Sequence, residues 1–264
     1  MGATTETGFG WATPILAYTM ACVGAALGLR CTATALTRTD RSKRNWLAAA
    51  AVSIGSGIWT MHFIAMLGFA VTGTDIRYDV GLTVFSLVVC IAVVGAGIFV
   101  VGYGSRRGPS LLLGGAVTGI GVAVMHYIGM AAMRLDGTVT YNPATVALSV
   151  AIAVLAAVAA LWAGLTIRGT AAVIGASLVM GVAVTAMHYT GMSAAEVKLA
   201  ADTVAASHAP ASGATAMDFL LPIIVGLGSA LFLTSAFVAL SPDGPAHPAA
   251  TAPSPAPHRR GSHA

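Results

Sequence analysis

The chain reads Met61-His62-Phe63-Ile64-Ala65-Met66 within a long apolar stretch, and the pattern returns as Met125-His126-Tyr127-Ile128-Gly129-Met130 and as Met187-His188-Tyr189-Thr190-Gly191-Met192. The three histidines are 64 and 62 residues apart, and a glycine stands six residues before the first methionine of each copy, at positions 55, 119 and 181. Self-similarity at a nearly constant spacing indicates a structural repeat. Each unit is long enough for two membrane-spanning helices.

The sequence around the motifs is strongly apolar. Of 264 residues, 57% are hydrophobic and 8% are charged, against about 25% charged in an ordinary soluble domain. Stretches of about 20 apolar residues predict spanning helices near 11–36, 46–71, 80–103, 111–133, 145–167, 170–194 and 217–240. We therefore expect an all-α, polytopic membrane protein with seven transmembrane helices, built from three two-helix repeats plus one extra helix.

The predicted membrane domain covers residues 11–240, between an extracytoplasmic N-terminus (1–10) and a cytoplasmic tail (241–264). The tail is rich in Pro and Ala, a composition typical of disorder. Basic residues cluster after the first, third and fifth predicted helices, so the positive-inside rule puts the N-terminus outside and the C-terminus in the cytoplasm of a multi-pass protein of the cell membrane. The net charge of +4 reports this orientation and indicates no nucleic-acid partner.

Two helices per repeat restore the chain direction, so the three motif helices all run outward and their motifs share one depth, in the outer third of the bilayer. Within each motif the histidine and the second methionine are four residues apart and share one helix face. The first methionine flanks that stripe. The predicted metal ligands are Met61, His62, Met66, Met125, His126, Met130, Met187, His188 and Met192.

Thioether sulfur is a soft ligand that favours Cu(I), and imidazole suits copper, zinc and iron, whereas the motifs hold no carboxylate for a hard cation. Copper is therefore the predicted cofactor. The hydroxyls of Tyr127 and Tyr189 are placed to orient a ligating imidazole or to hold a bound water or gas. Phe63 lacks this hydroxyl.

Several other interpretations stay open. A buried histidine can simply hydrogen-bond a neighbouring helix, but three at one depth favour a functional site. A copper transporter would need further ligands at inner depths, where Met20, Cys31, Cys90 and Met180 are scattered. Haem held by two histidines would leave the third unexplained. Neither a Ser-His-Asp arrangement nor a phosphate-binding loop is visible, so we expect no enzymatic activity.

The three motifs resemble those of the MHYT domain, an integral-membrane sensor domain of bacteria, over roughly residues 11–240. The resemblance implies a sensor whose Met, His and Tyr residues hold copper near the outer membrane face and so detect O2, CO, NO or redox state. Phe63 departs from the family motif, which has Tyr there. Many relatives carry fused cyclase, phosphodiesterase or kinase domains. This chain is expected to be a stand-alone form that signals through a separate cytoplasmic partner.

Overall fold

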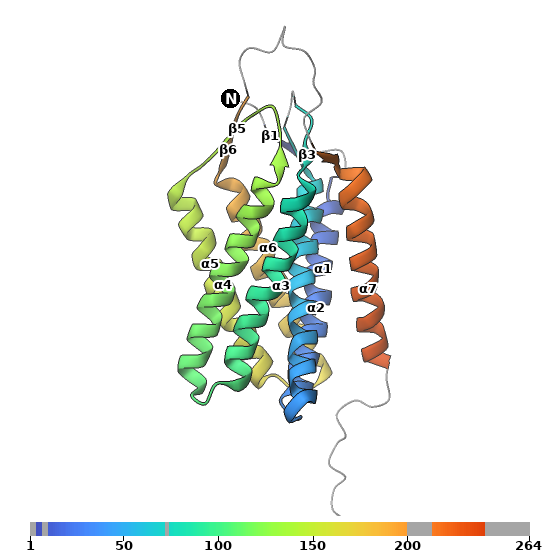
Figure 1. The fold of residues 1–264 in the computed structure, drawn as a ribbon, viewed down its shortest axis with the longest axis vertical. Coiled ribbons are helices and arrows are strands. Elements are labelled where there is room, and N and C mark those ends of the chain that lie inside the picture. Colours follow the sequence, from blue (N-terminus) through green and yellow to red (C-terminus); the bar gives the residue numbers. More distant parts are fainter. Residues whose placement is uncertain (1–3, 7–9, 72–73, 200–212, 241–264) are drawn as a thin grey trace, which may run out of the picture.

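The computed structural model describes residues 4–6, 10–71, 74–199 and 213–240. Seven helices in this part of the chain are long and apolar enough to span a membrane, which confirms the predicted all-α membrane fold (Figure 1). A short π-helix, η1 (Ala216–Leu220), precedes the last of them. The seven helices are α1 (Ala12–Ala35), α2 (Asp40–Leu67), α3 (Val80–Tyr103), α4 (Arg107–Ala131), α5 (Pro143–Thr166), α6 (Thr170–Ser193) and α7 (Leu221–Leu240).

Two helix starts show why the predicted bounds are close to the observed ones. The carboxylate of Asp79 accepts a hydrogen bond from the backbone N–H of Leu82 at 3.0 Å and so caps α3. The side chain of Asn142 caps α5 in the same way, with Pro143 at the first helical position. The second helix departs from its prediction at both ends, because it begins at Asp40 and ends at Leu67.

Short antiparallel strands lie at one end of the helix bundle, where α2, α4 and α6 end (Figure 1). The prediction was wrong for 69–71, which leave the second helix and form β2 (Phe69–Val71), paired with β1 (Thr4–Glu6). A three-stranded sheet joins β3 (Arg77–Tyr78) to β4 (Met133–Arg134) and β7 (Ala214–Thr215), and β5 (Gly137–Tyr141) pairs with β6 (Ala195–Leu199). Because these pairs join distant segments, helical hydropathy did not reveal them.

The first six helices form a closed ring, since each packs on the next and α6 packs on α1. The three repeat glycines lie at these contacts. A β-carbon at Gly55 would lie 2.9 Å from Cα of Ile91 on α3, one at Gly119 would lie 2.6 Å from the backbone nitrogen of Val154 on α5, and Gly181 meets side chains of α1. The absence of a side chain at these three positions therefore allows close helix contact.

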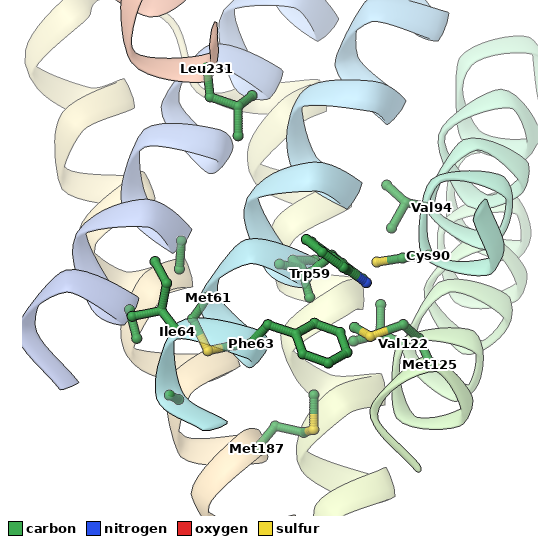
Figure 2. Close-up of a cluster of buried hydrophobic side chains, with 14 of the residues drawn as sticks. Trp59, Met61, Phe63, Ile64, Cys90, Val94, Val122, Met125, Met187 and Leu231 are labelled. Carbon is green, nitrogen blue, oxygen red and sulfur yellow. The ribbon is translucent and has the colours of Figure 1, made fainter. Parts of the chain in front are cut away.

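Helix α7 packs outside the ring, on α1 and α2. As a result α2 is the most completely buried helix of the bundle. Figure 2 shows the hydrophobic cluster around it, to which α3, α4, α6 and α7 also contribute side chains. The cluster includes Trp59, Met61, Phe63, Ile64, Cys90, Val94, Val122, Met125, Met187 and Leu231. The predicted tail, 241–264, lies outside the described residues.

Candidate metal centre

The three motif histidines meet in the middle of the ring. His62 of α2, His126 of α4 and His188 of α6 are each at most 1% exposed. The Nδ1 atom of His62 lies 3.0 Å from Nδ1 of His188 and 3.1 Å from Nδ1 of His126. The ring centroids are 4.9, 5.0 and 5.2 Å apart, with the ring planes nearly perpendicular. The repeat therefore produces a compact triad with its Nδ1 atoms turned inward.

The opposite edges of two rings lie against glycines of the next motif helix. A β-carbon at Gly129 of α4 would lie 2.9 Å from Cδ2 of His62 and closer still to its Nε2, and Gly191 of α6 stands in the same relation to His126. Among the described residues, neither of these two Nε2 atoms has a hydrogen-bonding partner. The glycines thus admit two imidazole edges to the helix backbone.

The triad has the size and chemistry of a metal site. Three nitrogens bound at about 2.0 Å from a common ion in a trigonal arrangement would be about 3.5 Å apart, a few tenths of an ångström more than the two Nδ1 contacts at 3.0 and 3.1 Å. Within the described ranges, these histidines are also the one group of three or more His, Cys, Asp or Glu side chains close enough to share an ion. The residues fit a metal that prefers imidazole.

Hydrogen bonding alone leaves the triad incompletely satisfied. A neutral imidazole carries one N–H and one lone pair, yet Nδ1 of His62 faces two other ring nitrogens at hydrogen-bonding distance, and its Nε2 has no partner in the described part of the chain. Such half-satisfied polar networks are costly in an apolar interior. A cation held by the inward lone pairs would give the Nδ1 atoms a common partner.

The predicted methionine ligands stand before and after each histidine of the triad in the sequence, and they are buried as the histidines are. Met61, Met66, Met125, Met130 and Met187 are at most 2% exposed, and Met192 is partly buried against the same hydrophobic cluster. Figure 2 shows the first methionine of each motif, Met61, Met125 and Met187, in that cluster. Burial is required both of a thioether ligand and of a packing residue, so ligation by methionine stays a prediction.

Comparison with known proteins bears on the repeat directly. The family model MHYT, described as "Bacterial signalling protein N terminal repeat", matches residues 55–115 and 119–177. The chain contains MHYT repeats. Each matched range begins at a repeat glycine, Gly55 or Gly119. The third motif follows after the second range. The resemblance predicted from the three motifs is confirmed.

Curated proteins that are similar in sequence to this chain include signalling proteins. The bifunctional diguanylate cyclase/cyclic di-GMP phosphodiesterase MucR of Pseudomonas aeruginosa is 40% identical over 60% of this chain and 24% of its own length. The cyclic di-GMP phosphodiesterase NbdA of the same organism is 39% identical over 61% and 21%. The signaling protein YkoW of Bacillus subtilis is 29% identical over 68% and 23%. The matched part spans about a quarter of these relatives. No solved structure matches the chain.

Aromatic residues that follow the MHYT histidines pack edge-on against them. Tyr127 lies 4.9 Å from His126, and Tyr189 lies 5.1 Å from His188, between ring centroids. The hydroxyl of Tyr127 is 2.8 Å from Oγ of Ser149 on α5, so in this structure it pairs with a serine of the neighbouring helix. The predicted contact of either hydroxyl with a water or gas stays a prediction. Sequence reasoning gave Ser149 no role.

Phe63, the first-copy departure from the MHYT motif, packs edge-on against His62 at 4.7 Å and against Tyr78 of β3 at 6.2 Å. Tyr78 is 2% exposed and packs on Phe63 from the strand layer. The next residue in the chain is Asp79. The backbone N–H of Leu82 and the guanidinium of Arg134 hold the pKa of its carboxyl below the usual value. Asp79 and Arg134 form an ion pair at 2.9 Å.

Two residues with direct ring contacts were missed at the level of sequence. Gly129 and Gly191 are the fifth residues of their motifs, three positions after the histidine. The available signal was a glycine in two of three copies with Ala65 in the other. Sequence alone could not show that each glycine receives a ring from a different motif.

Proposed function

We propose that this chain is an integral-membrane sensor that binds copper between His62, His126 and His188, and that O2, CO, NO or a change of redox state at that centre alters the packing of α2, α4 and α6. The observation that supports it most is the convergence of three buried Nδ1 atoms, with contacts of 3.0 and 3.1 Å. The MHYT repeats of this chain and its similarity to signalling proteins support the sensory role.

The residues of the chain would bind the metal ion, exclude water from it and transmit a change at the ion to the helices. The three imidazoles offer inward lone pairs, and their burial keeps water from the centre. Copper, when bound, would supply a redox-active ion with affinity for diatomic ligands, and neighbouring thioethers would favour Cu(I). Because each imidazole belongs to a different helix, any change in ligand geometry acts on three helices at once. Packed helices respond to such changes by discrete shifts.

The output is proposed to be cytoplasmic signalling. MucR and NbdA are enzymes of cyclic di-GMP metabolism by their names, and the matched region is about a quarter of each. We infer that this chain likewise controls a cytoplasmic signalling protein across the bilayer. Helix α7 packs on α2, which carries His62, and is therefore placed to respond to the triad.

Copper transport is the less favoured alternative. Transport needs a series of metal ligands spaced through the membrane. The candidate ligands at inner depths, among them Cys90 and Met180, do not form such a series. The thiol of Cys90 on α3 donates to the carbonyl of Gly55, whereas Met180 on α6 packs in a separate cluster with Leu29 and Val173. Saturable Cu(I) uptake into liposomes containing the protein would favour transport over sensing.

Metal analysis of the purified protein tests the copper site. The triple variant His62→Ala, His126→Ala, His188→Ala is compared with the parent, both lacking the tail histidines 247, 258 and 263 so that metal bound by the tail does not contribute. Met217→Ala, at an exposed methionine outside the motifs, serves as the matched control. We expect copper to be retained by the parent and the control and lost from the triple variant. Equal copper in all three proteins would refute the site.

A gas test follows from the same proteins. Carbon monoxide added to the reduced, copper-loaded parent should give an infrared band of bound CO, and the triple variant should give none. A band that persists without the histidines would place gas binding elsewhere.

A further inference from the structure

Two histidines of the triad lie against the next motif helix along the chain. His62 leaves α2 and its Nε2 edge lies on Gly129 of α4, and His126 leaves α4 and its Nε2 edge lies on Gly191 of α6. Both rings are at most 1% exposed. A methyl group at either glycine would occupy space that the ring now fills, since it would lie 2.9 Å from Cδ2 as well as against Nε2.

This contact decides which nitrogen faces the centre. An imidazole whose Nε2 edge is pressed on a helix backbone cannot offer that nitrogen to an ion shared with the other rings. Its Nδ1 is then the inward atom, as the contacts of 3.0 and 3.1 Å show. For Nδ1 to carry a free lone pair, the proton of the neutral ring must be on Nε2.

We propose that Gly129 and Gly191 are positioning residues of the metal centre, which seat the rings of His62 and His126 so that Nδ1 is the ligand atom. Ala65 stands at the equivalent place in the first motif, so the proposal covers the two rings whose contact with a glycine the structure shows. It rests on the proposed function where copper is concerned, but the ring positions are testable without metal.

The first experiment uses metal-free protein labelled with ¹⁵N-histidine, with ring signals assigned by single His→Gln variants. Gly129→Ala should change the Nε2 signal of His62 most, and Gly191→Ala should change that of His126 most. Gly175→Ala is the matched control, because this helical glycine of α6 has nothing within 4 Å of an added β-carbon. Changes that fall on the same ring in both variants, or that do not exceed those in the control, would overturn the proposal.

The second experiment measures Cu(I) affinity by competition with a chelator. Displacing a residue that orients a metal ligand typically weakens affinity about 10- to 100-fold, so we expect a loss of this size in Gly129→Ala and Gly191→Ala and none in Gly175→Ala. If the parent binds no copper while the ring signals change as expected, the proposed function fails and the positioning role stands. If copper binds with equal affinity to all four proteins, the positioning role fails.

A double variant keeps the inference testable if Gly129→Ala accumulates poorly. Removing the ring removes the clash, so Gly129→Ala combined with His62→Ala should accumulate and unfold like His62→Ala alone. A glycine needed only for helix packing would instead add its full cost in the double variant, and that result would contradict a ring-seating role.

Discussion

His62 holds a central place in the triad that its two counterparts lack. Its Nδ1 is within hydrogen-bonding distance of both His126 and His188. His62→Ala therefore removes both contacts, whereas His126→Ala and His188→Ala each remove one and leave a pair intact. We expect His62→Ala to be the most destabilising of the three substitutions in metal-free protein.

The size of the difference follows from the structure. The three rings are 1%, 0% and 1% exposed, and the substitution is the same, so the loss of packing nearly cancels in the comparison. A hydrogen bond between membrane helices contributes about 0.6 kcal/mol, and one in soluble proteins about 1 kcal/mol. Because the single lone pair at Nδ1 of a neutral His62 ring is shared by the two contacts, the extra cost of His62→Ala is at most about 0.6–1 kcal/mol, or about 2 °C in Tm for a chain of this size.

The assay is thermal unfolding of the three variants in the same detergent or nanodiscs, with a strong copper chelator present. The chelator matters because a bound ion would join all three imidazoles and make the substitutions equivalent. Restoring copper should raise the Tm of the parent and remove most of the ranking. If His126→Ala or His188→Ala lowers the Tm as much as His62→Ala without metal, the central role of His62 is wrong.

Three further predictions concern the frame around the site. Asp79 has a lowered folded-state pKa, so its contribution to stability is complete above the unfolded value of about 3.9 and is lost as the pH falls through the lower folded value; Asp79→Asn should flatten the Tm–pH curve in that acidic window. Ser86→Ala should destabilise by about 1–3 kcal/mol, measured by unfolding, because Nε1 of the buried Trp59 donates to its Oγ at 2.9 Å. A Trp59→Phe background should reduce the effect to the loss of the hydrogen bond from Ser86 to the carbonyl of Thr83. Gly119→Ala should cost about 1–3 kcal/mol by forcing α4 from α5, whereas Gly175→Ala should not destabilise.

The helices and the histidine cluster could be predicted from the sequence for separate physical reasons. Seven apolar stretches long enough to span a bilayer fix the helix count, since backbone groups in lipid must be paired within the segment. Three motifs on helices of the same direction then bring His62, His126 and His188 to one depth. The repeat thus sets their common depth, and the packing of the helices in a ring brings them together in the structure.

The strands could not be predicted in this way. Each is two to five residues long, and each pairs with a segment far along the chain, as 69–71 do with 4–6. Local hydropathy therefore extended the second helix over β2. A pairing of this kind depends on where the helix ends bring the connecting segments, which is a property of the assembled bundle.

The sequence by itself determined the membrane fold, the threefold repeat and the three histidines that meet, because helical period and chain direction place side chains along each helix. Tertiary structure alone decided that α1 closes the ring against α6, that Gly129 and Gly191 receive rings from other motifs, and that Nδ1 points inward. Helical periodicity gives the face from which a side chain leaves. The rotation of an imidazole about its own bonds is set by the backbone that lies against it, and this backbone belongs to a different helix.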